Sequence, residues 1–224
     1  MSEEHLKYYS DGIEIPSCTQ IVGLLDKPGL SNWANYMGFK RINTSKYLKE
    51  KAEYGDYCHK LAEVYFTDGL ISANTNSNFL SKDEYRDMVY KFKMLDLYFE
   101  KYKIKCLNNE FRLQGNTYGG TLDMICYDGL NDQLTILDFK TSKELYQSHW
   151  VQLMGYAQLV EEIYDIPVGK VGVILLSQKY TSKNLITIKD TKFLWRELNI
   201  FNKLKDIYYF INKTEDEIRT KGVI

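Results

Sequence analysis

Cysteine is scarce in this sequence, and its few cysteines are far apart. Cys18, Cys58, Cys106 and Cys126 are the four present, and no CxxC pair occurs. This spacing excludes a zinc site built from paired thiolates, and it excludes the dense disulfide framework of a small secreted domain. We therefore expect free thiols in a reducing compartment.

Long apolar runs and an excess of charge of either sign are also lacking. No uninterrupted apolar stretch approaches the roughly 18 residues that a membrane span requires. The N-terminal segment MSEEHLKYYSDG is acidic and has no apolar core of the kind found in signal peptides. The 29 Lys and Arg residues against 30 Asp and Glu leave a net charge of -1, so phosphate binding would depend on local patches. We expect a cytoplasmic protein, in a bacterial cell or a phage-infected host, without a membrane partner.

Proline is rare as well, with three residues that mark no linker, and there is no internal repeat. The hydrophobic share of 44% and the charged share of 26% are ordinary for a folded globular chain. We predict a single domain over residues 1–224. It consists of a mainly helical part over 1–105, a sheet core over 106–190 and a C-terminal helix over 191–224.

Hydrophobic periodicity predicts the elements of this domain. Met88, Phe92, Leu95 and Phe99 recur at helical spacing, whereas the segments after residue 106 alternate and are separated by turn residues. The predicted helices cover about 19–25, 30–42, 44–67, 82–103, 145–164 and 191–212. The predicted strands cover 107–114, 118–127, 133–139, 168–176 and 185–188, with an extended piece at 13–16 and a loop at 68–79. Helices around a strand meander followed by a buried strand indicate an α/β fold with a central mixed sheet flanked by helices.

The third of these strands ends in chemically active residues. Asp138 and Lys140 are two apart, so they point to the same side of the strand as Leu134 and Ile136. Burying a charge costs several kcal/mol unless the charge is paired or binds a metal. The change from apolar to charged residues along this side of the strand therefore needs a reason. A structural Asp–Lys ion pair at a strand end is one explanation. A catalytic site is the other.

Asp123, on the preceding strand of the hairpin, favours the catalytic explanation. Two carboxylates brought together repel each other, which raises one pKa unless a cation lies between them. Oxygen ligands of this kind suit Mg²⁺ or Mn²⁺. Such an ion activates water and neutralises charge on a phosphate, and Lys140 adds a cation that orients the attacking water or stabilises the phosphate oxygens.

Five short motifs together resemble a known family. They are YGDYCHKLAE (54–63), the strand beginning near Glu110, GGTLD (119–123), DFKTS (138–142) and QLMGY (152–156). In this order they are similar to the motifs of the RecB-type branch of the PD-(D/E)xK nuclease superfamily. The segment IPSCTQIVGLLDKPGLSNWANYMG also resembles compact phage and organellar exonucleases of this group. The resemblance implies a restriction-endonuclease-like core and a metal-dependent deoxyribonuclease.

The resemblance also implies roles for particular residues. His59, Asp123, Asp138 and the backbone carbonyl of Phe139 correspond to the family's metal ligands, for one or two Mg²⁺ or Mn²⁺ ions. Glu110 corresponds to an outer ligand that acts through water, with a plain strand-end charge as the alternative. Glu63 shares a helix face with His59 and is either a neighbour of the metal shell or a charge that faces solvent.

Gln152 and Tyr156 share one face of the following helix, because they are four residues apart. In the family this pair lies beside the active site and contacts the lysine or the DNA backbone. Otherwise the two are exposed polar residues of an amphipathic helix. Thr141 and Glu144 have the spacing of a capping box for this helix, with Ser148 as a rival cap.

A second candidate contact with nucleic acid lies upstream. Basic residues interleaved with Trp33 and Tyr36 suit single-stranded nucleic acid, although a solvated helix face explains them equally well. The basic residues are Lys40, Arg41, Lys46, Lys49 and Lys51.

Two absences narrow the expected activity. No cysteine follows Cys126, so the iron–sulfur cluster that some relatives carry, among them CRISPR-adaptation exonucleases, cannot form. No GxxxxGK[ST] loop is present, so we expect no ATP-driven motor. The sequence therefore predicts a DNA exonuclease that acts at ends or on single strands in recombination, repair or replication, with or without a protein partner. A structure-specific or restriction-like endonuclease and a non-catalytic nucleic-acid-binding module on the same fold are the alternatives.

Overall fold

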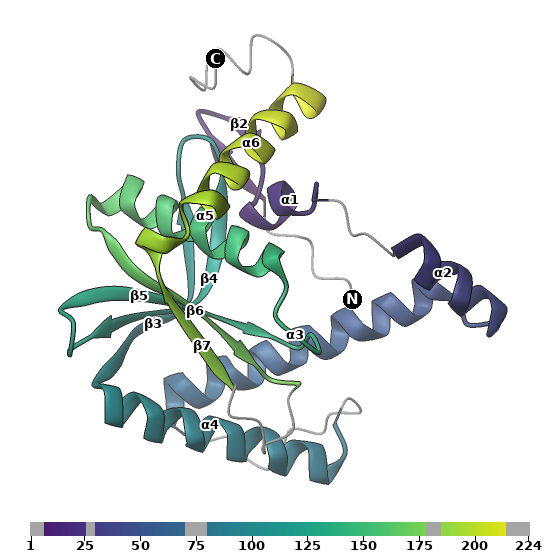
Figure 1. Ribbon diagram of the computed structural model, residues 1–224, viewed down its shortest axis with the longest axis horizontal. Helices are drawn as coiled ribbons and strands as arrows, with labels where there is room; N and C mark the ends of the chain where they lie inside the picture. The colour runs from purple at the N-terminus through teal and green to yellow at the C-terminus, as the bar shows by residue number, and fades with distance from the viewer. Residues whose placement is uncertain (1–6, 26–29, 70–79, 178–184, 214–224) are drawn as a thin grey trace.

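A five-stranded mixed sheet lies at the centre of the chain (Figure 1). The computed structural model describes residues 7–25, 30–69, 80–177 and 185–213. The strands are β3 (Ile104–Gln114), β4 (Gly119–Asp128), β5 (Gln133–Lys140), β6 (Val168–Leu175) and β7 (Ile186–Asp190), and they lie in the sheet in this order. Strands β3, β4 and β5 form the expected antiparallel meander, β6 pairs in parallel with β5, and β7 is antiparallel to β6. The α/β class predicted from the sequence is confirmed.

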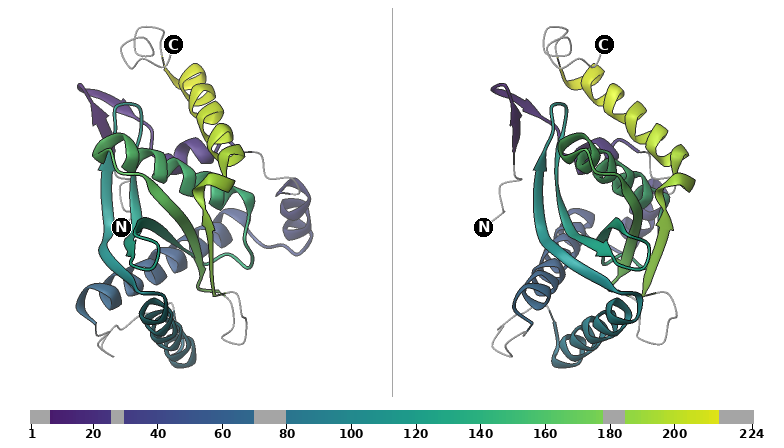
Figure 2. Two further views of the ribbon diagram at one scale, coloured as in Figure 1. Left: turned by 60° about the vertical axis from the view of Figure 1, so that its left-hand side comes forward. Right: turned by 90° about the vertical axis from the view of Figure 1, so that its left-hand side faces the viewer.

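Helices cover both faces of this sheet (Figure 2). One face carries α3 (Thr44–Asp68) and α4 (Lys82–Tyr102), and the other carries α1 (Cys18–Val22), α5 (Gln147–Tyr164) and α6 (Trp195–Asn212). The buried side chains accordingly form two clusters. Ile136 and Val173 belong to the cluster on the α5 face, whereas Leu137 and Ile174 belong to the cluster on the α3 and α4 face. Strands β5 and β6 are therefore buried on both sides, as expected of the apolar run at 168–176.

The remaining elements lie at the edges of this core. The short strands β1 (Tyr8–Ser10) and β2 (Ile13–Ile15) form a separate hairpin, of which the sequence patterns predicted only the second strand. Helix α2 (Leu30–Phe39) projects from the sheet alongside the N-terminal end of α3 (Figure 1). No helix in the described ranges has both the length and the apolar character needed to cross a bilayer. Ten residues of the predicted loop at 68–79 lie outside the described residues.

Local hydrogen bonds set the starts of the helices. Ser81 and Glu84 form a capping box at α4, and the Asn43 side chain caps α3 by accepting from the Lys46 N–H. The predicted start of α5 at residue 145, with a Thr141–Glu144 capping box or Ser148 as cap, is wrong. Helix α5 begins at Gln147 behind Tyr146, whose backbone N–H donates to His149 Nδ1 at 3.3 Å.

Other boundaries differ by a few residues. Helix α2 ends at Phe39 rather than near residue 42, where Arg41 adopts a positive φ of 55°. The predicted last helix is divided, because residues Thr191–Phe193 form a 3-10 turn before α6 begins. These differences leave the order of elements around the sheet unchanged.

Candidate active site

Asp123 and Asp138 lie across from each other where β4 and β5 stop pairing. The last paired residues are Met124 and Leu137, and continuing this register by one residue brings the two aspartates opposite each other. At this point the backbone N–H of Phe139 donates to Asp123 Oδ2 at 2.6 Å. The Asp123 carboxylate therefore accepts the next hydrogen bond in place of a backbone carbonyl, at the point where β4 and β5 separate.

The second oxygen of Asp123 contacts helix α3. Asp123 Oδ1 is 3.1 Å from Nδ1 of His59, which lies on α3 one turn beyond the point where Gly55 packs near Thr141. The contact fixes the imidazole beside the strand ends, and the ring of Phe139 supports it edge-on at a centroid distance of 6.3 Å. The structure thus brings His59 and Asp123 together. The role of His59 as a metal ligand remains a prediction.

Glu110 completes a cluster of three possible ligands. Asn109 pairs with Met124 and Phe111 pairs with Leu122, so Glu110 lies opposite Asp123. Its φ of 45° is unusual for a residue within a strand and turns the backbone locally. One ligand atom from each of His59, Glu110 and Asp123 lies within 4.8 Å of the others. This spacing allows Glu110 to bind the same ion either directly or through water, so its role as an outer ligand remains a prediction.

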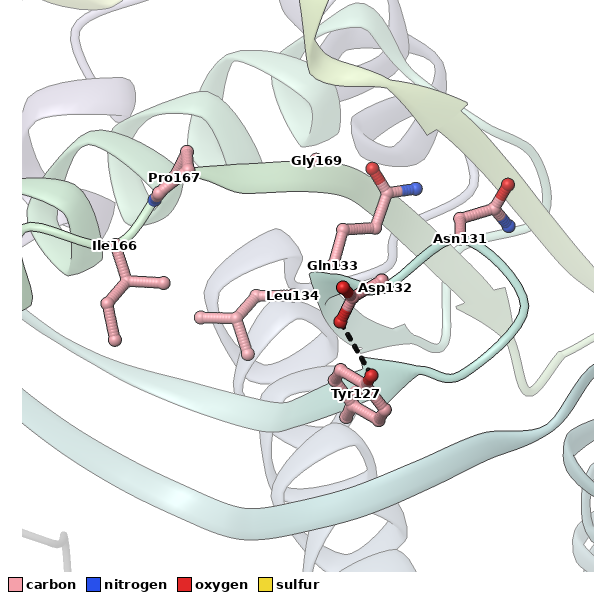
Figure 3. Close-up of a pocket in the computed structure, with 8 residues that line it drawn as sticks. All are labelled: Tyr127, Asn131, Asp132, Gln133, Leu134, Ile166, Pro167 and Gly169. Atoms are coloured by element: carbon pink, nitrogen blue, oxygen red, sulfur yellow. Dashed lines mark hydrogen bonds between the residues drawn. The ribbon is translucent and has the colours of Figure 1, made fainter.

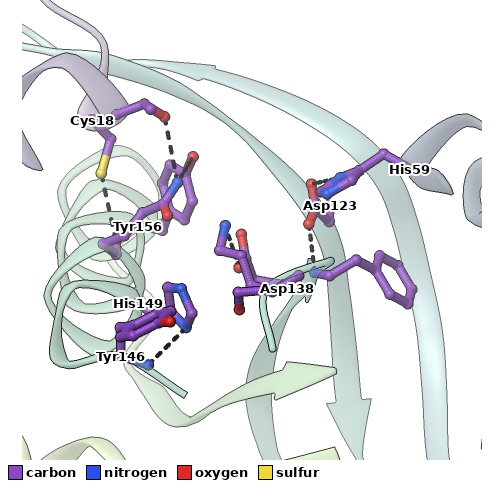
Figure 4. A network of polar contacts seen from close by, with 12 residues as sticks. Cys18, His59, Asp123, Asp138, Tyr146, His149 and Tyr156 are labelled. Atoms are coloured by element: carbon purple, nitrogen blue, oxygen red, sulfur yellow. Dashed lines mark hydrogen bonds and ion pairs between the residues drawn. The ribbon is translucent and has the colours of Figure 1, made fainter. Parts of the chain in front are cut away.

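Asp138 does not join this cluster and is instead held by Lys140. Asp138 Oδ2 is 2.6 Å from Lys140 Nζ, and the Asp138 side chain is nearly inaccessible. Both residues lie on the side of the sheet that carries Ile136, as the alternation of the strand predicted. Figure 4 shows Asp138 between the Asp123–His59 pair on one side and residues of α5 on the other. Asp138 Oδ2 also has no hydrogen bond of ordinary geometry among the described residues.

The electrostatics of these groups show that the site attracts positive charge. Burial, together with the Asp123 carboxylate, raises the pKa of Asp138 to about 6 despite the neighbouring Lys140. Burial and Asp123 likewise raise the pKa of Glu110 to about 7. Burial alone would lower the pKa of His59, but Asp123 and Asp138 raise it to about 9. Protonation of His59, Glu110 and Asp138 is therefore favoured, because it reduces the electrostatic repulsion among the three carboxylates.

Gln152 and Tyr156 lie on the α5 side of the same site. Gln152 Nε2 donates to the Tyr156 hydroxyl at 3.0 Å, and Tyr156 is 4% exposed, so the pair is not a solvated helix face. A Cβ on Gly120 would lie 2.5 Å from Tyr156 Cε1. The second glycine of GGTLD therefore makes room for the tyrosine of QLMGY, which links two of the sequence motifs by direct packing.

Some neighbours of the site were not predicted from the sequence. The Cys18 thiol donates to the Gln152 carbonyl at 3.5 Å and is fully buried against the site, where burial and the Asp138 carboxylate raise its pKa. Tyr146 and His149 approach from the start of α5 (Figure 4). A lone cysteine at the first position of a short helix has no sequence signal that distinguishes it from an ordinary core residue. Glu63 pairs with Lys60 at 2.5 Å and does not join the ligand cluster.

A separate pocket of about 550 Å³ lies at the opposite end of β5 (Figure 3). Its walls include Leu134, Ile166 and Pro167, and its Tyr127 hydroxyl donates to Asp132 at 2.7 Å. None of the candidate site residues lines it. The candidate site is therefore the group of residues with shifted pKa values around Asp123, and this pocket is separate from it.

The donor set fits a hard divalent cation. The ligand atoms of two carboxylates and one imidazole lie within 4.8 Å of one another, and Asp138 Oδ2 lacks a well-oriented partner. Burial and the neighbouring Asp123 raise the pKa values of Glu110 and Asp138. Carboxylate oxygens are typical ligands of hard divalent cations, and imidazole is a common ligand of transition metals.

Comparisons with known proteins leave the family open. No family model matches the chain, and no curated protein matches it. Among solved structures, the crystal structure of SSO0001 aligns with 13% identity and a TM-score of 0.29. The alignment covers 55% of this chain and 62% of that one.

Proposed function

We propose that this protein is a metal-dependent deoxyribonuclease that hydrolyses phosphodiester bonds, with its active site at the point where β4 and β5 stop pairing. The observation that carries the proposal is the convergence of His59, Glu110 and Asp123 beside the buried Asp138–Lys140 pair. A purely structural ion pair would not need two further acids and an imidazole crowded next to it.

Each residue has a role that follows from its position. Asp123, Glu110 and His59 would hold Mg²⁺ or Mn²⁺, with Asp138 and the backbone of Phe139 next to them. When bound, such an ion lowers the pKa of water and neutralises charge on the phosphate. The Asp138 and Asp123 carboxylates raise the pKa of Lys140, so its ammonium group stays charged and can orient the attacking water or stabilise the phosphate oxygens.

The α5 pair supports the same site from the opposite side. Gln152 has a partly exposed amide that donates to Tyr156 and approaches Thr19 Oγ1 at 3.4 Å. We infer that Gln152 contacts the DNA backbone and that Tyr156 positions it. Phosphate contacts of this kind fix the substrate without selecting a sequence.

Action on DNA ends or single strands, in recombination, repair or replication, is the form of activity that we propose. The decisive assay is incubation of linear, covalently closed circular and single-stranded DNA with Mg²⁺ or Mn²⁺, with and without chelator. Degradation of linear and single-stranded DNA only would support an exonuclease, and cutting of the closed circle would support an endonuclease. Equal rates for the wild type and Lys140→Ala would refute the proposal.

A non-catalytic nucleic-acid-binding module is the second candidate. Its support is the pairing of Asp138 with Lys140 at 2.6 Å, which leaves Asp138 outside the ligand cluster. Tight DNA binding without metal-stimulated cleavage would favour this alternative.

A further inference from the structure

Helix α2 is apolar in composition but mostly exposed. Of its ten residues, LSNWANYMGF, the only buried one is Met37. Tyr36 is 54% exposed and Phe39 is 89% exposed. Both rings are therefore available to a ligand outside the domain. We call α2 together with residues 40–54 the arm.

Basic side chains of the arm lie over its aromatic rings. Lys40 Nζ is 4.6 Å from the centroid of the Tyr36 ring, and Lys51 Nζ is 5.7 Å from the ring centroids of both Tyr47 and Tyr54. The Trp33 ring packs on Tyr47 at a centroid distance of 5.9 Å and joins the two helices. Positive charge and aromatic surface therefore alternate along one continuous segment.

The arm leads directly to the candidate active site. Helix α3 carries Lys51 and Tyr54 on the arm, then Gly55, whose Cβ position lies 3.5 Å from Thr141 Oγ1, then His59. Thr141 follows Lys140 in the chain. Figure 1 shows α3 running from beneath the sheet out to α2. A polymer lying along the arm would therefore enter the site at the end of β5.

We propose that the arm binds single-stranded DNA and feeds it to the site, a proposal that rests on the proposed function. Exposed rings stack with bases of any sequence, and the lysines neutralise the backbone phosphates. The Lys46–Glu50 and Lys49–Glu53 pairs, at 3.9 and 3.8 Å, are exposed and weak, so phosphates can replace these acids as partners. A second copy of the chain or a duplex would not need this alternation of charge and rings.

The test measures binding and cleavage separately. Anisotropy of a labelled single-stranded oligonucleotide in chelator should show the full-length Tyr36→Ala and Phe39→Ala variants binding about fivefold to a hundredfold more weakly than wild type. The matched control is Phe210→Ala, which removes a ring that is 84% exposed on α6 and should bind like wild type. Replacing Lys46, Lys49 and Lys51 by Gln should also reduce the slope of log affinity against log salt.

Each outcome separates the arm from the active site. Unchanged oligonucleotide binding by the arm variants, stronger binding of duplex, or a change in oligomeric state instead of DNA affinity would overturn the role of the arm. Cleavage of a nitrophenyl phosphodiester, which is too short to reach the arm, reports on the active site alone. Loss of oligonucleotide binding in the arm variants would support the arm even if the wild type cleaves neither substrate.

A separate observation concerns two cysteines that are neighbours on adjacent strands of the sheet. Cys106 on β3 and Cys126 on β4 are direct partners in the antiparallel register. Opposite residues in such a ladder have Cα atoms about 4.5–5.5 Å apart, which lies within the range that a disulfide spans. Cys106 is the more accessible of the two, and its thiol donates to Asn109 Oδ1 at 3.1 Å. The neighbouring Cys126 thiol lowers the pKa of Cys106.

We infer that Cys106 and Cys126 form a redox-active dithiol that a small-molecule disulfide oxidises. The Cys106 thiolate attacks one sulfur of that disulfide and releases one thiolate. Cys126 then loses its proton, attacks the Cys106 sulfur in the mixed disulfide and releases the second thiolate. Two protein thiols are oxidised, and one small-molecule disulfide is reduced to two thiols.

Oxidised glutathione and peptide mapping test this inference. The folded full-length chain should lose about 2 Da through one link between Cys106 and Cys126, a loss that dithiothreitol reverses. Cys58→Ser should give the same link because Cys58 is fully buried elsewhere in the core, whereas Cys106→Ser should give none. No link in the folded protein, or a link that involves Cys18 or Cys58 instead, would overturn the inference.

Discussion

Two Asp–Lys pairs with a buried aspartate lie on the central sheet. In only one of them do both carboxylate oxygens of the aspartate accept hydrogen bonds of ordinary geometry. Asp128 Oδ2 is 2.9 Å from Lys170 Nζ, and Asp138 Oδ2 is 2.6 Å from Lys140 Nζ. Both aspartates are less than 5% exposed. Distance and burial alone would therefore assign them the same structural purpose.

Their other hydrogen bonds differ. Asp128 accepts from the backbone N–H groups of Leu130 and Asn131 and from the Asn131 amide. Burial would raise the pKa of Asp128, but Lys170 and these donors lower it. Asp138 instead faces Asp123, and its pKa is raised to about 6. A buried carboxylate with a raised pKa beside other acids is typical of sites that bind a cation or take part in a reaction.

The largest expected difference between the two pairs is in catalysis. Lys140→Ala should reduce metal-dependent DNA cleavage by about a hundredfold to a thousandfold, because it removes a charge positioned at the reacting phosphate. Lys170→Ala should leave the rate per folded molecule within about twofold. Initial rates on linear DNA, normalised to the folded fraction, measure both. A comparable loss in the two variants would mean that the pairs do not differ in function.

The next difference is in stability, with the opposite ranking. Asp128→Asn should lower the free energy of unfolding by about 3 kcal/mol, because it leaves Lys170 without its buried counter-ion. Asp138→Asn should be less destabilising, because Asp123 remains to offset the charge of Lys140 and because burial disfavours ionisation of the carboxylate that is removed. Urea unfolding in chelator at neutral pH provides the comparison. Greater destabilisation by Asp138→Asn would reverse our assignment of the two pairs.

The two pairs also predict opposite responses to pH. The pKa of Asp128 is lower in the folded state, so its contribution to stability is complete above pH 4 and is lost as the pH falls through the folded pKa. The pKa of Asp138 is higher in the folded state, so stability falls as the pH rises from about 4 to about 6, by at most about 3 kcal/mol. Each slope should disappear in the corresponding Asn variant. Unfolding curves between pH 3 and 7 would show an unchanged slope if either assignment is mistaken.

Local patterns in the sequence predicted much of the fold, but little of the difference between the Asp128–Lys170 and Asp138–Lys140 pairs. Alternation placed Asp138 and Lys140 on one side of a strand, and the hairpin brought Asp123 to the strand end. Lys170, which donates to the Asp128 carboxylate, lies 42 residues away in the sequence, and no local pattern predicts this contact. No local pattern indicated the positive φ of Glu110, although the family resemblance placed this residue near the metal ligands.

The helix starts illustrate the same limit. Thr141 and Glu144 match a capping box in sequence, but the backbone C=O of Lys140 accepts from the Leu176 N–H, and α5 begins later at Gln147. The ring of Tyr156 fits against Gly120 only after α5 docks on β4. Tertiary packing selected these contacts among several that the sequence permitted.

The central claim is that acids located where β4 and β5 stop pairing hold a divalent cation, and Mn²⁺ binding tests it most directly. Electron paramagnetic resonance titration of Mn²⁺ should show binding by the wild type, with a loss of about tenfold or more in affinity for Asp123→Asn and unchanged affinity for Asp128→Asn. Absence of Mn²⁺ binding by the wild type, or equal affinity in the Asp123→Asn variant, would contradict the account.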